Sequence, residues 1–466
     1  MLNLLRHNRR LRACMILAAA LFLFTAGCGG GGNGRSSVVV FSDVHFNPFY
    51  DPAIFDSLMN SPENQWNDIF QSSAVTDPEP WENETNYPLL VRMLEALRTQ
   101  SAANPVVVFS GDMLTHGFSK KFYTLYGSED EAAMRAFTYK TVAFFAAQVR
   151  DYLGQIPVVF TLGNNDSYEG DYKIDPGGAF LADTADLLYS TLLLEKADYA
   201  GYVETYRAGG YYAMSVGPVM FISLNTILFS PNAATDIEGA VSQELDWLDR
   251  TLAGARAQEK RVWLVMHIPP GADIYSTVTK YMDPAGRISD ASTMWKTEYQ
   301  DRFLNIVDTY VDMIDVAFAG HTHMDEYRLD VNENGASQTV ILVTPAISPL
   351  FGNDSAFKVI RIESSDWTPI DYRSTAYHFG DAAPVFGPYY TFTNAYASTE
   401  AGLESALVAL FPKLQTDPTL RQAYSGYYYS GHNNAGPIDD INWPAYWCGI
   451  GNMTKEDYME CVNTYD

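Results

Sequence analysis

The chain has 466 residues, 47% of them hydrophobic, and its 56 acidic and 30 basic residues give a formal net charge of −26. This length suffices for one large domain with a sizeable core and an appended subdomain. We do not expect so acidic a chain to bind nucleic acid, polyphosphate chains or an anionic membrane as an extended partner, because like charges repel.

Residues 1–27 are typical of a signal peptide. Four arginines precede an apolar stretch over 15–24, and small residues follow it up to Cys28. Residues 25–28 resemble a bacterial lipobox, and the glycine-rich residues 28–36 are typical of a flexible tether. We therefore expect an exported bacterial lipoprotein, anchored to the membrane by a lipid on Cys28, on the periplasmic or cell-surface side. The alternatives are ordinary signal cleavage nearby and a transmembrane helix, although the apolar run is short of the ~20 residues that a helix needs to span.

Five short polar motifs each follow an apolar, β-branched run of the kind that forms a buried strand. The predicted strands are residues 38–41, 106–109, 158–162, 262–266 and 316–319. The motifs that follow them are Asp43-Val44-His45, Gly111-Asp112, Gly163-Asn164-Asn165-Asp166, His267 and Gly320-His321-Thr322-His323. Five strand ends should therefore bring carboxylate, amide and imidazole groups to one edge. Such a mixture of ligands accepts zinc, iron or manganese.

Helices are predicted between these strands, so the fold class is α/β. Residues 88–100 carry apolar side chains at helical spacing, residues 128–131 have the pattern of a capping box that opens a helix, and residues 242–253 form a third helix. Residues 334–335, Asn-Gly, predict a hairpin turn. The tyrosine-rich tail over 376–466 contains no metal-ligand pattern, and we expect it to form a small, mostly helical C-terminal subdomain.

The order of the motifs resembles the calcineurin-like metallophosphoesterases, in which D-x-H, G-D, G-N-H-[DE], a single H and G-H-x-H follow one another. Asn165 is the one departure, because most of that superfamily has histidine there. His116, four residues after Asp112, and the stretch 344–357 are similar to the acid-sphingomyelinase-like phosphodiesterase branch. The resemblance covers roughly residues 37–375 and implies a catalytic domain built as a layered β-sandwich flanked by helices.

The resemblance also implies a site for two divalent metal ions, of which zinc is the first choice and iron or manganese the alternatives. It assigns one ion to Asp43, His45, Asp112 and His323, and the other to Asp112, Asn164, His267 and His321. Asp112 is thus the expected shared carboxylate, and a hydroxide between the ions is the implied nucleophile. His116 is the candidate donor of a proton to the leaving alkoxide. Asn165 either leaves His116 as the single donor or orients the phosphate by hydrogen bonding.

We therefore expect a hydrolase, a dimetal phosphodiesterase, acting on phosphodiester or phosphoanhydride bonds. The candidate substrates are a small phosphodiester, a phospholipid headgroup and a nucleotide. Inserts over 46–87 and 166–212 are rich in aromatic residues, which could stack a nucleobase, enclose a choline ammonium or simply pack. The alternatives are a nucleotide or polyphosphate phosphohydrolase of the same fold and, from another class, a catalytically inactive surface-anchored binding protein. The complete ligand set disfavours the inactive protein.

Two cysteines remain once Cys14 is assigned to the leader and Cys28 to the anchor. These two, Cys448 and Cys461, lie thirteen positions apart, which is an easy loop to close in an oxidising compartment. We expect them to form a disulfide, and the sphingomyelinase-like branch also has one near its C-terminus.

Overall fold

The structure is a computed structural model that describes residues 35–331, 337–432 and 436–465. The predicted signal peptide, the lipidation site Cys28 and the predicted turn at 334–335 lie outside these residues. None of the described helices combines the length and the apolar character that a membrane crossing requires.

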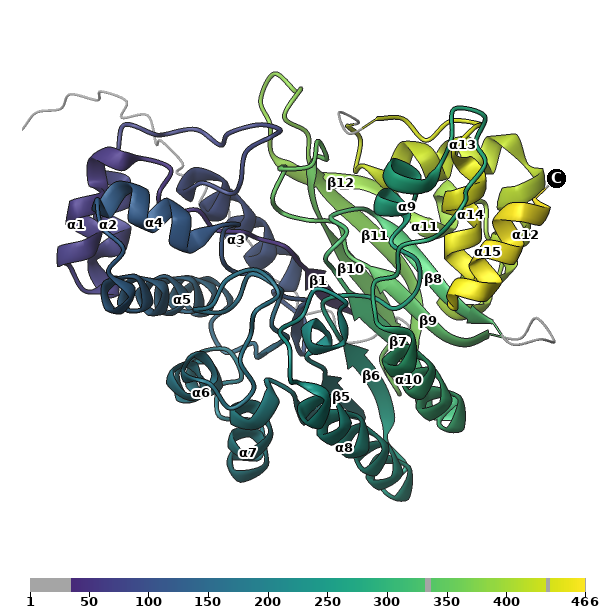
Figure 1. Cartoon of the computed structure of the whole chain (residues 1–466), viewed down its shortest axis with the longest axis horizontal. Helices are drawn as coiled ribbons and strands as arrows, with labels where there is room; N and C mark the ends of the chain where they lie inside the picture. Colours follow the sequence, from purple (N-terminus) through teal and green to yellow (C-terminus); the bar gives the residue numbers. More distant parts are fainter. Residues whose placement is uncertain (1–34, 332–336, 433–435, 466) are drawn as a thin grey trace, which may run out of the picture. The chain divides into compact units, whose positions relative to one another are not determined.

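The strands form two mixed sheets of six strands each (Figure 1). The first sheet contains β1 (Arg35–Phe41), β2 (Val107–Phe109), β3 (Val158–Phe160), β10 (Ser355–Glu363), β11 (Pro369–Tyr377) and β12 (Phe386–Thr391), in the order β12-β11-β10-β1-β2-β3. The second contains β4 (Tyr212–Val216), β5 (Val219–Ser223), β6 (Arg261–Val265), β7 (Ile314–Ala319), β8 (Glu326–Val331) and β9 (Ser337–Val343), in the order β4-β5-β6-β7-β9-β8.

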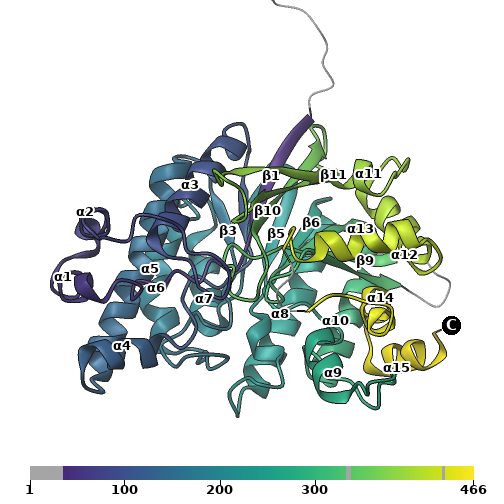
Figure 2. The ribbon, with the colours of Figure 1, turned by 90° about the horizontal axis from the view of Figure 1, so that it is seen from above.

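Helices flank both sheets, as the view from above shows (Figure 2). The α-helices are α1 (Phe55–Asn60), α2 (Trp66–Gln71), α3 (Tyr87–Ser101), α4 (Phe118–Tyr126), α5 (Glu131–Leu153), α6 (Ala179–Thr191), α7 (Tyr199–Gly209), α8 (Glu238–Ala257), α9 (Ile274–Tyr281), α10 (Thr297–Thr309), α11 (Phe392–Ala395), α12 (Leu403–Thr416), α13 (Pro418–Tyr428), α14 (Trp443–Gly451) and α15 (Lys455–Thr464). Short 3₁₀ helices are η1 (Pro52–Ile54), η2 (Glu63–Gln65), η3 (Thr226–Phe229) and η4 (Val311–Met313).

The five predicted ligand-bearing strands are confirmed as β1, β2, β3, β6 and β7. In the first sheet β1, β2 and β3 run parallel, and in the second β5, β6, β7 and β9 do. Their apolar residues are almost completely buried, as expected for parallel strands covered on both faces. Parallel direction places the carboxyl ends of β1, β2 and β3 at one edge, and those of β6 and β7 at one edge of the other sheet.

Hydrogen bonds between β3 and the second sheet hold the two sheets together. Tyr212 and Ser223 donate their hydroxyls to the Phe160 carbonyl, each at 2.8 Å. The Thr161 hydroxyl donates to the Leu224 carbonyl at 2.6 Å, just beyond the ends of β3 and β5. The two ligand-bearing edges therefore meet.

The three predicted helices are confirmed as α3, α5 and α8, but the start of α5 differs from the prediction. Its N-cap is Asp130, whose side chain accepts from the Ala133 amide at 3.0 Å, and not Ser128. Because α4 ends at Tyr126, residues 127–129 are needed to reverse the chain. An aspartate at the N-cap also interacts favourably with the helix dipole.

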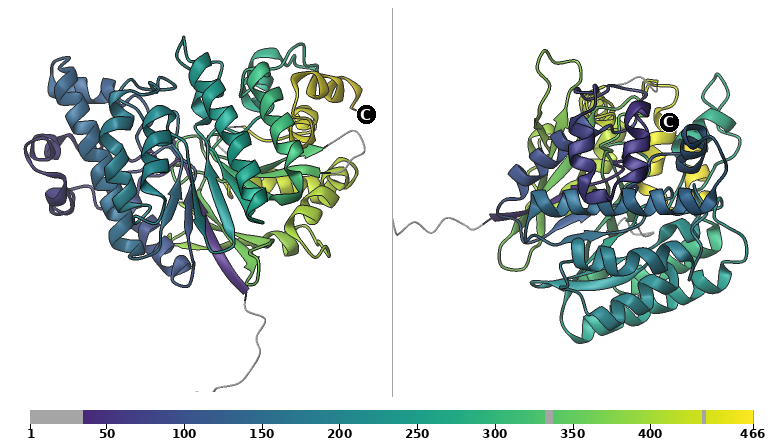
Figure 3. Two further views of the ribbon diagram at one scale, coloured as in Figure 1. Left: turned by 90° about the horizontal axis from the view of Figure 1, so that it is seen from below. Right: turned by 90° about the vertical axis from the view of Figure 1, so that its left-hand side faces the viewer.

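The C-terminal region is mostly helical, as expected, although β12 extends the first sheet before the helices begin. Helix α12 packs on strands β11 and β9. Helix α14 packs on strand β8 and on helix α9. The C-terminal helices, yellow in Figure 1 and Figure 3, thus cover one side of the second sheet. The predicted disulfide between Cys448 and Cys461 is confirmed and joins α14 to α15.

Candidate metal centre

The seven predicted ligands converge where the strand ends of the two sheets meet. Six are buried and His321 is half-buried. Five of them have a positive backbone φ: Asp43 (50°), His45 (46°), Asp112 (62°), His321 (73°) and His323 (66°). Non-glycine residues rarely adopt this conformation, and such strain collects at functional sites, where the surrounding fold maintains it.

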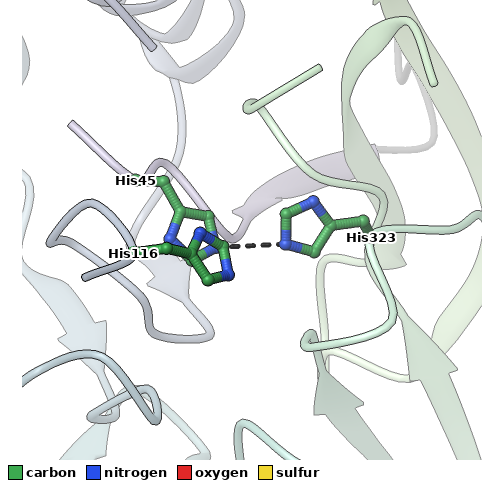
Figure 4. Close-up of side chains that lie close together, drawn as sticks. All are labelled: His45, His116 and His323. Carbon is green, nitrogen blue, oxygen red and sulfur yellow. Dashed lines mark hydrogen bonds between the residues drawn. The ribbon is translucent and has the colours of Figure 1, made fainter. Parts of the chain in front are cut away.

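One group of ligands surrounds His45. Its Nε2 atom lies 3.1 Å from Nε2 of His323 and 3.3 Å from Oδ2 of Asp112. The same His323 nitrogen lies 3.6 Å from Oδ1 of Asp43. Figure 4 shows the His323 ring pointing towards His45 from the opposite side of the site. These four side chains are those that the family resemblance assigned to the first ion.

A second group surrounds Asn164. Its Oδ1 atom lies 3.0 Å from Nε2 of His267 and 2.9 Å from Nδ1 of His321. Nε2 of His267 also lies 3.2 Å from Oδ2 of Asp112. Oδ2 of Asp112 is therefore within 3.3 Å of an imidazole nitrogen in each group, so the geometry agrees with its assignment as the shared carboxylate.

Hydrogen bonds outside the centre turn the ligand atoms inward. Nδ1 of His45 donates to the Leu114 carbonyl at 3.0 Å, and Nδ1 of His267 donates to the Ser110 carbonyl at 2.7 Å. Nδ2 of Asn164 donates to Oδ1 of Asp171 at 2.6 Å. The two Nε2 lone pairs and the Asn164 carbonyl oxygen are thus left for a cation, as in well-characterised metal sites.

The charges of the centre also suit divalent cations. Burial, followed by the charges of neighbouring histidines, lowers the pKa of His45 and of His321 to about 3, so both rings are neutral. Burial raises the pKa of Asp43 to about 7. Burial alone would lower the pKa of His267, but the Asp112 carboxylate outweighs it and the pKa rises to about 9. The neutral rings of His45 and His321 beside crowded, buried carboxylates form a donor set that fits divalent ions, and a cation at this position would displace the proton from Nε2 of His267.

Two glycines allow the ligand loops to approach one another. A Cβ atom on Gly111, whose φ is +96°, would lie 2.8 Å from the Gly163 amide nitrogen and 2.9 Å from Nδ1 of His267. A Cβ atom on Gly163 would overlap the backbone and the side chain of Asp112. The glycines before Asp112 and Asn164 therefore serve close backbone packing.

The two predicted catalytic residues lie beside the ligands. The His116 ring stacks on His45 with the centroids 4.1 Å apart, and with His323 these rings form a cluster that could itself hold a metal ion (Figure 4). Asn165 donates to both oxygens of Asp112, from its amide nitrogen at 2.8 Å and from Nδ2 at 3.1 Å. Asn165 thus orients the expected shared carboxylate, and its role in orienting phosphate stays a prediction.

Three further residues, Asp166, Glu84 and Asp171, support the centre and are not among the predicted site residues. Both carboxylate oxygens of Asp166 accept backbone amides, from Gly163 and from three consecutive residues starting at Asp112, and so clamp two ligand loops together. Asp166 was visible as the last residue of its motif. Glu84, which binds His116, and Asp171, which binds Asn164, lie in the inserts, where no pattern marks them.

A cavity of about 510 Å³ lies beside the ligands. The insert over 166–212 contributes Tyr172, whose hydroxyl lies 3.1 Å from Nε2 of His321. Other tyrosines of this insert are buried: Tyr168, Tyr206, Tyr211 and Tyr212. The far wall comes from α9 and the C-terminal helices and includes Tyr275, Tyr428, Tyr429 and Tyr446. The C-terminal region therefore shapes the site as well as packing against the core.

Comparisons with known proteins place the chain in a family by its sequence. The family model described as calcineurin-like phosphoesterase matches residues 36–325. Among curated proteins, the chain is 23% identical to a Rattus norvegicus cyclic GMP-AMP phosphodiesterase, SMPDL3A, covering 85% of this chain and 86% of that protein. It is 21% identical to the Homo sapiens acid sphingomyelinase-like phosphodiesterase 3b, over 95% of this chain and 93% of that protein. It is 26% identical to a Dictyostelium discoideum sphingomyelinase phosphodiesterase C, over 57% of this chain and 54% of that protein.

Among solved structures, a dimetal phosphatase from Danio rerio matches with a TM-score of 0.40 and 13% identity, over 76% of this chain and 99% of that one.

The family model spans well over half of the chain and includes all seven predicted ligands. The chain therefore belongs to the calcineurin-like phosphoesterase family and is a dimetal hydrolase of phosphoester bonds.

Proposed function

We propose that the protein is an exported phosphodiesterase, anchored by a lipid on Cys28, that hydrolyses small phosphodiesters. The observation that carries this proposal is the position of Oδ2 of Asp112, 3.3 Å from His45 and 3.2 Å from His267. A pair of divalent ions requires one carboxylate between two groups of ligands. The complete ligand set supports an active enzyme over an inactive binding protein of the same fold.

The seven ligands would hold two divalent ions, with zinc proposed first and iron or manganese as alternatives. When bound, such ions would supply an activated water molecule and neutralise charge on the phosphoryl oxygens. Asn165 keeps the Asp112 carboxylate in place through its two hydrogen bonds. His116, whose ring lines the cavity, donates a proton to the leaving oxygen.

The charges of the cavity favour a substrate whose non-reacting part is neutral or cationic. Besides Asp112, four carboxylates line the cavity: Glu82, Asp171, Asp273 and Glu326. The cavity wall also contains Arg328, but its guanidinium lies 3.4 Å from the Glu326 carboxylate and donates to the Pro270 carbonyl. A second phosphate would meet a wall of negative charge, whereas a zwitterionic headgroup would not.

Nucleotide phosphodiesters are the second candidate. Two aromatic side chains of the cavity wall are strongly exposed, Tyr275 at 68% and Phe351 at 45%, and either could stack a base. Several of the relatives are named as cyclic GMP-AMP phosphodiesterases.

Hydrolysis of bis-p-nitrophenyl phosphate, with and without chelator, tests the proposal. We expect metal-dependent turnover that Asp112→Asn abolishes and that Asp56→Asn, a change on the exposed surface of α1, leaves intact. Glycerophosphocholine, a cyclic dinucleotide and ATP then separate the substrate classes. Two ions bound per chain without turnover of any diester would contradict the proposal.

Export and anchoring need a separate test. In bacterial cells, labelled palmitate should appear on the wild-type protein in the membrane fraction and be absent from Cys28→Ser. Equal labelling of both proteins, or none of either, would contradict the lipid anchor.

A further inference from the structure

Glu84 is a buried carboxylate to which the proposed function assigns no role. It lies in the segment between α2 and α3, is only 6% exposed, and binds the residues that follow the Asp112 motif. Oε1 accepts from the backbone amide of His116 at 2.6 Å and from its ring nitrogen Nδ1 at 3.0 Å. Oε2 accepts from the hydroxyl of Thr115 and from the amino group of Lys121.

The contacts around Glu84 form a closed network. The Lys121 amino group also donates to the Thr115 hydroxyl at 2.6 Å, so both partners of Oε2 are held in place. Burial alone would raise the pKa of Glu84, but the hydrogen bond from His116 and the charge of Lys121 outweigh it and lower the pKa to about 2. An ionised carboxylate with four donors is well fixed, because charge-assisted hydrogen bonds are stronger than neutral ones.

The network restricts the His116 ring in two ways. Because a carboxylate only accepts, Nδ1 must carry a proton, and Nε2 is then the nitrogen left to meet a substrate. The stack on His45, at 4.1 Å between centroids, fixes the plane of the ring. The ring also lines the cavity, next to the expected ligands Asp112 and His323.

We propose that Glu84 is a positioning residue that holds His116 with Nε2 directed to the leaving oxygen of the substrate. This inference rests on the proposed function. As water attacks, a new P–O bond forms, and the bond from phosphorus to the leaving oxygen breaks, with its electron pair going to that oxygen. His116 donates as the imidazolium, with one proton on Nδ1 bound to Glu84 and one on Nε2, and the Nε2 proton passes to the same oxygen and completes the alcohol. The proton that the attacking water gives up restores His116.

Two substrates that differ in the leaving group test this role. p-Nitrophenyl phosphocholine releases a phenolate that needs no proton, whereas glycerophosphocholine releases an alkoxide that does. We expect Glu84→Ala to lower kcat on glycerophosphocholine by about 100-fold, in the range for loss of general acid catalysis. We expect kcat on the nitrophenyl substrate to change less than about threefold, with KM and the metal content unchanged.

Three further variants sharpen the test. Glu84→Gln should recover part of the activity, because its amide oxygen can still accept from Nδ1 of His116. Glu84→Ala combined with His116→Ala should be no slower than His116→Ala alone, since the two residues act as one unit. Glu129→Gln, a change of an exposed glutamate, is the matched control and should match the wild type on both substrates.

The outcomes separate this inference from the function on which it rests. Wild-type protein that cleaves no phosphodiester contradicts the proposed function. Active wild type with equal losses on both substrates in Glu84→Ala, or additive losses in the double variant, overturns the positioning role. Loss of one metal ion per chain in His116→Ala would make His116 a ligand, within the cluster with His45 and His323, and would also overturn it.

Discussion

At the scale of the residue, burial alone decides the charge of one carboxyl group outside the metal centre. Glu244 is completely buried in α8, and its Oε1 accepts from the Asn225 amide at 2.7 Å. Neither Oε2 of Glu244 nor Oδ1 of Asn225 has a hydrogen-bond partner among the described residues. Burial raises the pKa of Glu244 from 4.5 to about 8, so the carboxyl is neutral in the folded protein at neutral pH.

The expected result is a pH-dependent contribution of Glu244 to the free energy of unfolding. The folded state binds this proton more tightly than the unfolded state, so the contribution is complete below the unfolded pKa near 4.5. It is lost at up to ~1.4 kcal/mol per pH unit as the pH rises towards 8. The free energy of unfolding of Glu244→Gln, measured by urea denaturation, should therefore exceed that of the wild type by a larger amount at pH 8 than at pH 5. Parallel pH dependences of the two proteins would contradict the neutral carboxyl.

At the scale of the element, the loop between β7 and β8 is held by a buried ion pair. This loop contains His321 and His323 and ends at Asp325, whose Oδ1 lies 2.9 Å from the amino group of Lys358 on β10. Oδ2 of Asp325 accepts from the Tyr390 hydroxyl of β12 at 2.8 Å. The loop is thus tied to the first sheet, although it belongs to the second.

Lys358→Met should destabilise the protein by about 3–5 kcal/mol, because it leaves the Asp325 charge buried without its partner. Metal affinity should fall as well, since His323 is two residues from Asp325. Thermal unfolding and metal content measured after dialysis check both effects, with the exposed Lys120→Met as control. A variant as stable as wild type that still binds two ions would show that the pair does not hold the loop.

At the scale of the whole molecule, the metal centre should join the two sheets. Asp43 and Asp112 follow strands of the first sheet, whereas His267 and His323 follow strands of the second. Ions that bind only the folded arrangement stabilise it by mass action, by about 4 kcal/mol when free metal exceeds Kd a thousandfold.

Chelation should therefore lower the midpoint of thermal unfolding of the wild type, and added zinc or manganese should restore it. Asp112→Asn, which lacks the expected shared carboxylate, should show a much smaller shift. Differential scanning calorimetry with and without chelator measures both. An unchanged midpoint after two ions have been removed would mean that the sheets pack equally well without metal.

The five ligand-bearing strands, the order of the motifs and the disulfide could be predicted from the sequence. Strand runs and motifs are local patterns, and parallel strands bring their carboxyl ends together by geometry. The contact of Glu84 with His116, the clamp formed by Asp166 and the tyrosine wall from the C-terminal helices emerge only from the packing of the elements. The first of these contacts joins residues 32 positions apart, and the clamp reaches 54 positions back to Asp112. No short segment of the chain encodes such a contact, because it depends on how distant elements pack.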